Sequence, residues 1–170
     1  FMDGIECSMF VVTDGKAFHL LPSAKDYKRF GEGNTGPNTG GMGAISPVPF
    51  MDAEFHEKAL NQIIIPTVKG LAADGISYNG FIFFGLMKVG GDPYVVEYNC
   101  RMGDPETQVV LPLLESACFE VMMACATGRL AELPPVRWAD AVAAAKARRE
   151  AEARRLKALA DAEAAREAEA

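Results

Sequence analysis

Short apolar runs separated by turn residues dominate the first part of the chain. Residues 5–12 and 17–21 are rich in aliphatic and aromatic side chains, and residues 13–16 between them read Thr-Asp-Gly-Lys, a hairpin-turn composition. A second pair of apolar runs, residues 81–89 and 94–99, flanks the turn sequence Gly-Gly-Asp-Pro. The pattern predicts two antiparallel strand pairs, and the second pair is apolar enough for both of its strands to lie inside a sheet.

Helical spacing replaces strand alternation after residue 52. Asp52 suits the N-cap position, and apolar residues follow at helical intervals from residue 55 to residue 71. Pro66 predicts a kink or the start of a second segment. Residues 74–75, an Asp-Gly pair, predict the end of the helix.

Two later segments contrast in composition. Residues 111–130 give a helical pattern that ends at Gly128 or soon after. Residues 31–49 are so rich in glycine and proline that they cannot hold a helix or a central strand, which predicts a long functional loop or a disordered one. Strands and helices therefore mix without a strict βαβ repeat, and the expected fold class is α+β or mixed α/β.

The composition changes abruptly after Pro134-Pro135. The preceding part is apolar enough for one globular domain with a core. Residues 139–170 are mostly alanine and balanced charges, which favours an exposed single helix; weak self-association of that helix is the alternative. We therefore expect a domain over residues 1–137 and a helical tail over residues 138–170.

Charge and cysteine content narrow the function classes. A formal net charge of -6 argues against a nucleic-acid binder with a basic surface. No apolar run approaches the roughly 20 residues of a membrane span, no signal peptide is recognisable, and a first residue other than Met suggests a fragment. The four cysteines lack metal-site spacing, which predicts reduced thiols in a cytoplasmic protein.

Polar side chains accumulate at the end of the last predicted strand, in the sequence YVVEYNCRMGDPETQ. Alternation places Val95, Glu97, Asn99 and Arg101 on one face. Glu97 and Asn99 offer the hard oxygen donors that suit Mg²⁺ completed by water and nucleotide phosphates, and Arg101 would then face a phosphate. The alternative is an edge strand whose polar residues face water.

Two carboxylates follow this strand around a proline. A rigid turn at Pro105 would aim Asp104 and Glu106 at an amine substrate or at Arg101. The alternative is that Asp104 or Thr107 caps the next helix.

The glycine-rich segment offers a second candidate site. Residues 31–36 match GxGxxG by letter, but more loop follows where a dinucleotide site needs a helix, and no Walker lysine is present. Backbone N–H groups in the following segment can approach an anion closely because its side chains are small. The candidates are Asn38, Thr39, Gly40, Gly41 and Gly43. A merely flexible loop is the alternative, and the preceding Lys25, Lys28 and Arg29 either add charge to the anion site or are simply solvated.

Three ordered segments carry a resemblance to a known family. They read DGIECSMFVVTDG, AKDYKRFGEGNTGPNTGGMGAISPVP and VVEYNCRMGDPETQ. Together they closely resemble the phosphoribosylamine–glycine ligases, also called glycinamide ribonucleotide synthetases, from residue 1 to about Trp138. The resemblance implies the second, C-terminal lobe of an ATP-grasp domain, an α+β lobe with an antiparallel or mixed sheet and flanking helices, followed here by a long exposed helix.

The resemblance also implies a reaction. ATP would phosphorylate the carboxylate of glycine, and 5-phosphoribosylamine would attack the acyl phosphate to give glycinamide ribonucleotide in purine synthesis. It implies Glu97 and Asn99 as ligands of Mg²⁺ or Mn²⁺, and residues 40–43 as the loop near the phosphates. The group implied on the substrate side, with catalytic roles, is Arg101, Asp104 and Glu106. For the phosphate side we add Lys25, Asn38 and Thr39 to the loop.

This chain departs from the family pattern in two respects. Many ATP-grasp enzymes carry another acidic metal ligand on the preceding strand, yet residues 81–87 contain no carboxylate, so a second metal would need a ligand from another segment. The other domains of the family are absent, so we expect an inactive fragment unless the missing lobes are supplied in trans. The alternatives are a non-enzymatic scaffold whose tail mediates assembly, and another ATP-grasp ligase of purine synthesis, such as a carboxylase.

Overall fold

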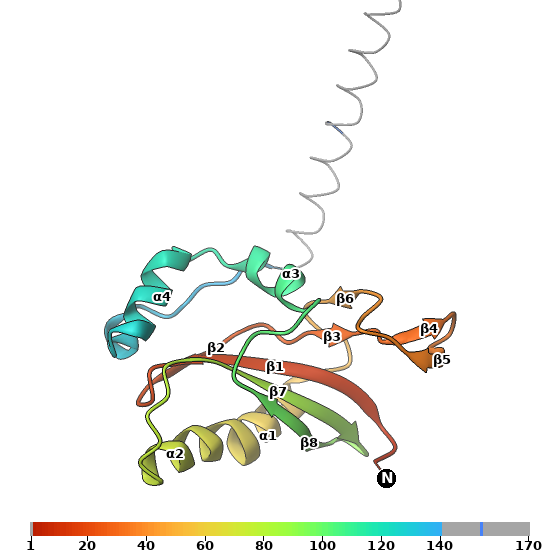
Figure 1. The fold of residues 1–170 in the computed structure, drawn as a ribbon, viewed down its shortest axis with the longest axis horizontal. Coiled ribbons are helices and arrows are strands. Elements are labelled where there is room, and N and C mark those ends of the chain that lie inside the picture. The colour runs from red at the N-terminus through yellow and green to blue at the C-terminus, as the bar shows by residue number, and fades with distance from the viewer. Residues whose placement is uncertain (1, 141–153, 155–170) are drawn as a thin grey trace, which may run out of the picture. The chain divides into compact units, whose positions relative to one another are not determined.

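The computed structural model describes residues 2–140 and residue 154 (Figure 1). The chain divides into two compact units, Phe1–Trp138 and Ala139–Ala170. The expected helical tail falls on the second unit, which, apart from residues 139, 140 and 154, lies outside the described residues. Within the described part of the chain, no helix has the length and apolar character that crossing a membrane requires.

A four-stranded antiparallel sheet forms the centre of the first unit (Figure 1). Its strands, in the order β2-β1-β7-β8, are β1 (Ile5–Thr13), β2 (Phe18–Leu20), β7 (Gly80–Val89) and β8 (Asp92–Asn99). Both predicted hairpins are confirmed, and positive φ angles at Gly15, Gly90 and Gly91 show why glycine occupies their turns. The expectation that both later strands lie inside the sheet is wrong, because β8 is an edge strand.

Each face of the sheet packs on its own apolar cluster, because side chains of β1 and β7 alternate between the faces. Helices α1 and α2 cover one face, and the segment with α3 and α4 lies on the other (Figure 1). The helix-side cluster includes Cys7, Met9, Val11, Ile82, Phe84 and Leu86. The opposite cluster includes Phe10, Val12, Phe83, Val121 and Leu130. The sheet is therefore the middle layer of a three-layer unit.

The helix predicted after Asp52 is present but interrupted. It consists of α1 (Ala53–Ala59), a π-helical turn (Leu60–Ile64) and α2 (Ile65–Ala73). The Asp52 carboxylate caps α1 by accepting a hydrogen bond from the backbone N–H of Phe55 at 2.8 Å. Pro66 begins the second segment as expected, because it has no N–H for a regular helical bond and the preceding turn widens.

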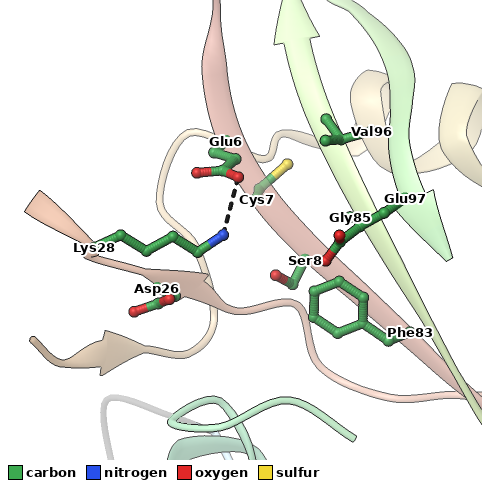
Figure 2. A pocket seen from close by; sticks show the side chains of 9 residues that line it. All are labelled: Glu6, Cys7, Ser8, Asp26, Lys28, Phe83, Gly85, Val96 and Glu97. Atoms are coloured by element: carbon green, nitrogen blue, oxygen red, sulfur yellow. Dashed lines mark hydrogen bonds and ion pairs between the residues drawn. The ribbon is translucent and has the colours of Figure 1, made fainter. Parts of the chain in front are cut away.

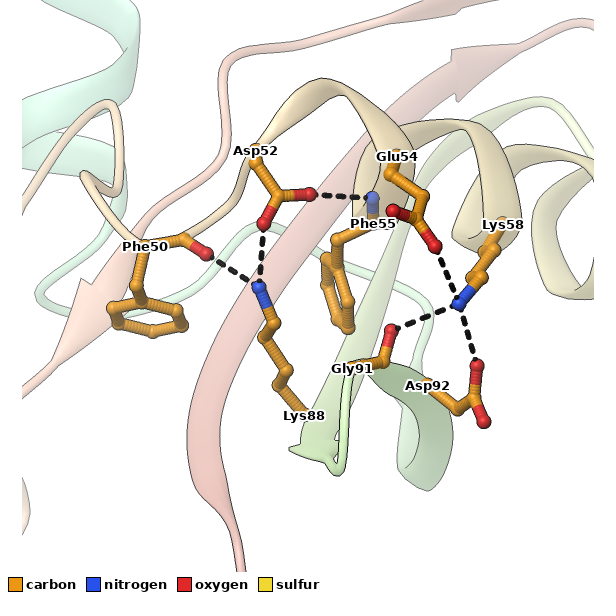
Figure 3. Close-up of polar contacts among 8 residues, drawn as sticks. All are labelled: Phe50, Asp52, Glu54, Phe55, Lys58, Lys88, Gly91 and Asp92. Atoms are coloured by element: carbon orange, nitrogen blue, oxygen red, sulfur yellow. Dashed lines mark hydrogen bonds and ion pairs between the residues drawn. The ribbon is translucent and has the colours of Figure 1, made fainter.

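Two lysines connect α1 with the β7–β8 hairpin (Figure 3). Lys88 Nζ lies 2.9 Å from the Asp52 carboxylate, and Lys58 Nζ lies 2.9 Å from Glu54 and 2.8 Å from Asp92. Partly exposed ion pairs of this kind contribute about 0–1 kcal/mol each. The apolar cluster beneath them therefore supplies most of the stability, and the lysines orient the helix.

Residues 25–45 form short strands rather than a plain loop. Strand β3 (Lys25–Asp26) pairs with β6 (Ala44–Ile45), and β4 (Arg29–Gly31) pairs with β5 (Thr35–Asn38). The sequence predicted that this segment holds no helix and no central strand, and this is confirmed, since each small sheet has only two strands.

The continuous helix expected over residues 111–130 is wrong. The described segment holds α3 (Thr107–Val110), a 3₁₀ turn (Leu111–Leu113), α4 (Cys118–Ala126) and a second 3₁₀ turn (Leu130–Glu132). Pro112 cannot donate a backbone hydrogen bond, and Leu114 leaves the helix to form an antiparallel bridge with Trp138. Only the end of the helical pattern at Gly128, with φ +70°, follows the expectation.

Candidate metal and phosphate site

A β-bulge breaks the predicted alternation along β8. Leu86 on β7 pairs with Val95, whereas the next residue back, Gly85, pairs with Glu97, so Val96 is the extra residue. Val95 therefore packs against the helix-side cluster, while Val96 and Glu97 line a hollow with Gly85 (Figure 2). The expectation that Val95 and Glu97 share a face is wrong.

Glu97 and Asn99 lie next to each other at the end of this edge strand. The amide nitrogen of Asn99 donates to Glu97 Oε1 over 3.0 Å. Across the described residues, no group of three or more His, Cys, Asp and Glu side chains is arranged to hold a metal ion. One carboxylate beside one side-chain amide therefore suits Mg²⁺ only with water and phosphate oxygens as the remaining ligands. The edge position of β8 agrees with the water-facing alternative, so only the contact between the two side chains favours a metal site.

A small cavity adjoins Glu97 on the sheet face away from α1 and α2 (Figure 2). Its volume is about 10 Å³, room for one water-sized group. The residues that line it are Glu6, Cys7, Ser8, Asp26, Lys28, Phe83, Gly85, Val96 and Glu97. Sequence reasoning missed Glu6, Ser8 and Asp26. Polar residues at alternate positions of an otherwise apolar strand were the available signal for Glu6 and Ser8.

Two buried carboxyl groups lie beside this cavity. Asp26 is 8% exposed and Glu106 is 4% exposed. Ser8 Oγ donates to Glu106 Oε1 over 3.1 Å, whereas Asp26 Oδ1 is buried without a hydrogen-bond partner. Burial, and then the charge of Glu106, raises the pKa of Asp26 above its ordinary value, although Lys28 and Lys25 act in the opposite direction.

The structure separates the three residues expected on the substrate side. Glu106 points inward to Ser8, while Arg101 and Asp104 are exposed. Arg101 donates to the carbonyl of Met102 at 2.9 Å, and Asp104 accepts from the Gln108 side chain at 2.7 Å. Among the described residues, neither carboxylate forms an ion pair with Arg101.

The alternative that Asp104 or Thr107 caps the following helix is wrong. No side chain caps the N-terminus of α3. Thr107 instead bonds through its hydroxyl to the carbonyl of Gly103. Neither Asp104 nor Thr107 therefore caps α3.

The glycine loop packs against the turn that holds Glu106. Thr39 anchors the loop, since its hydroxyl donates to the carbonyl of Lys28 at 2.8 Å and accepts from the Gly41 N–H at 3.1 Å. A Cβ on Gly41 would lie 2.8 Å from Pro105 Cδ and 3.2 Å from Asp26 Oδ1. The two candidate segments, about 60 residues apart in the chain, are therefore in contact.

An open groove beside the cavity brings the basic residues together. Lys25, Lys28, Arg29 and Asn38 line it. Lys25 Nζ donates to the carbonyl of Glu6 at 3.1 Å, and Lys28 Nζ lies 3.1 Å from the Glu6 carboxylate. Arg29 is already engaged with the carbonyl of Gly36 at 2.9 Å. Of the residues expected to bind phosphate, Asn38 and Gly40 are exposed, and Gly43 accepts a hydrogen bond from Tyr27.

Substituting Gly41 tests the packing of the loop. Gly41→Ala should lower the free energy of unfolding by about 1–3 kcal/mol, because φ is +131° and the added Cβ would meet Pro105. Urea unfolding measures the change. Gly40→Ala is the matched control, since nothing lies within 4 Å of its added Cβ, and a change within about 0.5 kcal/mol is expected there. Equal effects of the two substitutions would contradict the contact.

Comparisons with known proteins agree on one family. Residues 1–107 match the model described as "Phosphoribosylglycinamide synthetase, ATP-grasp (A) domain". The chain is 50% identical over 134 residues to a phosphoribosylamine–glycine ligase of Chlorobaculum tepidum, covering 79% of this chain and 32% of the relative. It is 49% identical over 135 residues to the corresponding ligase of Salmonella typhimurium, covering 78% and 31%.

A solved structure gives the same result. The phosphoribosylamine–glycine ligase of Thermotoga maritima is 37% identical, with a TM-score of 0.72, and the likeness covers 82% of this chain and 34% of that one. The chain thus spans about a third of the length of the relatives it matches.

Proposed function

Because this chain belongs to the phosphoribosylglycinamide synthetase family through its ATP-grasp (A) domain, we propose that it holds the metal and phosphates during ATP-dependent ligation of glycine to 5-phosphoribosylamine. The observation that carries the proposal is the juxtaposition of Glu97 and Asn99 at a strand end, next to a polar cavity. The names of the relatives, which are ligases of phosphoribosylamine and glycine, supply the substrates.

The residues divide into a metal side and a phosphate side. Glu97 and Asn99 would hold Mg²⁺ or Mn²⁺, which neutralises charge on the nucleotide phosphates during transfer. Lys25 and Lys28 line the groove that we assign to the phosphates, with the glycine loop at its side. Glu106 acts from within the protein, through Ser8. Arg101 and Asp104 are exposed and available to a substrate that approaches from outside.

The reaction needs no nucleophilic side chain. A carboxylate oxygen of glycine takes the γ-phosphoryl group of ATP, and ADP leaves. The amine of 5-phosphoribosylamine then attacks the carbonyl of glycyl phosphate, a C–N bond forms, and inorganic phosphate leaves. Protein groups contribute positioning and charge neutralisation, which account for most of the catalysis of phosphoryl transfer.

A reconstitution experiment tests this function. The chain is mixed with ATP, glycine, 5-phosphoribosylamine and Mg²⁺, alone and with the remaining segments of the Chlorobaculum tepidum ligase expressed separately. We expect glycinamide ribonucleotide only in the complemented mixture, because half of an ATP clamp binds nucleotide weakly. We place this activity in the cytoplasm.

Three outcomes would argue against the proposal. Failure to bind Mg²⁺–nucleotide under every condition contradicts it. A concentration-dependent oligomer that disappears when residues 139–170 are deleted, without any activity on complementation, favours the scaffold. A different product in a substrate screen of the complemented protein favours another ligase of purine synthesis.

A further inference from the structure

The two proposed metal ligands have different neighbours across the β7–β8 pair. Beyond the β-bulge, Asn99 pairs with Phe83. Glu97 pairs with Gly85. Directly opposed residues of an antiparallel pair have their side chains on the same face and close together. Asn99 therefore lies across from a large ring, whereas Glu97 lies across from a residue that has no side chain.

The backbone conformation does not account for a glycine at position 85. Gly85 is buried in a central strand, where glycine packs no side chain and is unfavourable. Its φ angle lies outside the positive region, so the backbone alone would accept alanine. The extra residue of the bulge is Val96, on the other strand. A glycine inside a strand also marks the close approach of another group, and the neighbours of Gly85 identify that group.

The group that comes close is the base of the Glu97 side chain. A Cβ added at Gly85 would lie 2.9 Å from Glu97 Cγ and 3.1 Å from Phe83 Cε1. Glu97 therefore lies across β7 over Gly85 and does not stand away from the sheet (Figure 2). In this position Glu97 Oε1 accepts from the Asn99 amide at 3.0 Å, and the side chain reaches the cavity that Lys28 also lines.

A methyl group at position 85 would force Glu97 to turn about its Cα–Cβ bond. Cγ lies near the base of the side chain, so bending the flexible end cannot relieve a contact of 2.9 Å. Rotation to another staggered conformer carries the whole carboxylate with it. The carboxylate then leaves Asn99, and the two proposed ligands no longer lie side by side.

We infer that Gly85 is a positioning residue for the metal site. Because it lacks a side chain, Glu97 lies across β7 and holds its carboxylate beside Asn99 at the cavity. Gly85 acts on the metal only through Glu97. The inference rests on the proposed function and deepens it, since it identifies what keeps the charged metal ligand in place.

Gly85→Ala tests the inference in a titration of the full 170-residue chain with a fluorescent ATP analogue, with Mg²⁺ and again with EDTA. We expect the affinity with Mg²⁺ to fall about tenfold, less than for Glu97→Gln, because the charge is displaced but not removed. With EDTA the affinity should stay within about twofold of wild type. A purely structural role of Gly85 would not produce this dependence on Mg²⁺.

A double substitution shows whether the effect passes through Glu97. Glu97→Ala leaves no Cγ for the added methyl group to meet. In that background Gly85→Ala should therefore change the affinity by less than about twofold, with or without Mg²⁺. Gly70→Ala, on α2, is the matched control for adding a methyl group to a glycine. Nothing lies within 4 Å of its added Cβ and its φ is not positive, so the affinity should be unchanged.

The contact with Phe83 offers a purely structural reason for the glycine. Phe83 is 6% exposed, and a contact of 3.1 Å requires the ring to shift by a few tenths of an ångström. Thermal unfolding of each variant measures the effect of this crowding. We expect Gly85→Ala to remain folded at the temperature of the titration, because the Glu97 side chain is exposed and free to turn toward solvent.

Each other result overturns the inference. Unchanged affinity with Mg²⁺ in Gly85→Ala, under conditions in which Glu97→Gln loses it, means that Glu97 keeps its place beside the methyl group. An unfolded Gly85→Ala, an equal loss with Mg²⁺ and EDTA, or a loss that persists in the Glu97→Ala background places the need for glycine in the core beside Phe83. These results leave the proposed function intact. Absence of Mg²⁺–nucleotide binding in the wild-type chain removes the proposed function together with the inference.

Discussion

Glu97→Gln is expected to lower the affinity of the chain for Mg²⁺–nucleotide on the order of a hundredfold and to leave the fold unchanged. Of the two proposed metal ligands at the end of β8, Glu97 and Asn99, Glu97 carries the charge. Two opposite unit charges about 4 Å apart near a protein surface attract each other by roughly 4 kcal/mol. Removing the carboxylate charge loses this attraction to the metal, and better hydration of the metal offsets part of the loss. Glutamine keeps an oxygen that can accept from Asn99, and the side chain is exposed, so packing is not disturbed.

The measurement is a titration with a fluorescent ATP analogue, with Mg²⁺ and again with EDTA. The difference between wild type and Glu97→Gln should be large with the metal and should nearly vanish without it. Glu120→Gln is the control, since it is an exposed carboxylate on α4. Unchanged affinity for both Mg²⁺ and nucleotide in Glu97→Gln would remove Glu97 from the metal site.

The elements that local sequence signals determine were predicted well. The β1–β2 turn contains Gly15 at φ +82°, and α1 begins at a carboxylate that bonds a backbone N–H within its own first turn. Neither feature depends on distant parts of the chain. Turn chemistry and capping therefore sufficed to place both hairpins and the start of α1.

Features determined by neighbouring elements were not predictable in this way. The bulge that turns Val95 toward the helices arises from the pairing of β8 with β7, around the buried Gly85. The break after α3 combines a local signal, Pro112, with the long-range bridge from Leu114 to Trp138. The spacing of apolar residues along one segment does not reveal its register with a neighbouring strand, nor a β-bridge to a distant residue.

The same limit applies to the site. Glu97 and Asn99 could be predicted as metal ligands because they lie two residues apart in one strand. Asp26, Ser8 and Glu106 come from three segments of the chain, and only the fold brings them together. From the sequence, Asp104 and Glu106 were equally good candidates for the substrate side. In the structure, the orientation of the turn points Glu106 to the interior and leaves Asp104 exposed.

Phe84→Ala is expected to lower the free energy of unfolding by about 3–5 kcal/mol, which is the usual cost of emptying a buried aromatic site. Phe84 is 0% exposed in the helix-side cluster, on a central strand of the sheet. Its ring also meets the Tyr98 ring edge to face, with centroids 5.6 Å apart, so the loss reaches β8 between Glu97 and Asn99.

Because a domain of this size is stable by only about 5–15 kcal/mol, Phe84→Ala should be close to unfolding at 37 °C. Urea unfolding followed by circular dichroism measures the lost stability. A titration with Mg²⁺–nucleotide at urea concentrations below the unfolding transition shows whether binding at Glu97 and Asn99 weakens as well. Phe119→Ala is the matched control, since that ring is 75% exposed and its removal should change stability by less than about 0.5 kcal/mol. Similar losses for the two phenylalanines would mean that the sheet and α1 are not held together by the helix-side cluster.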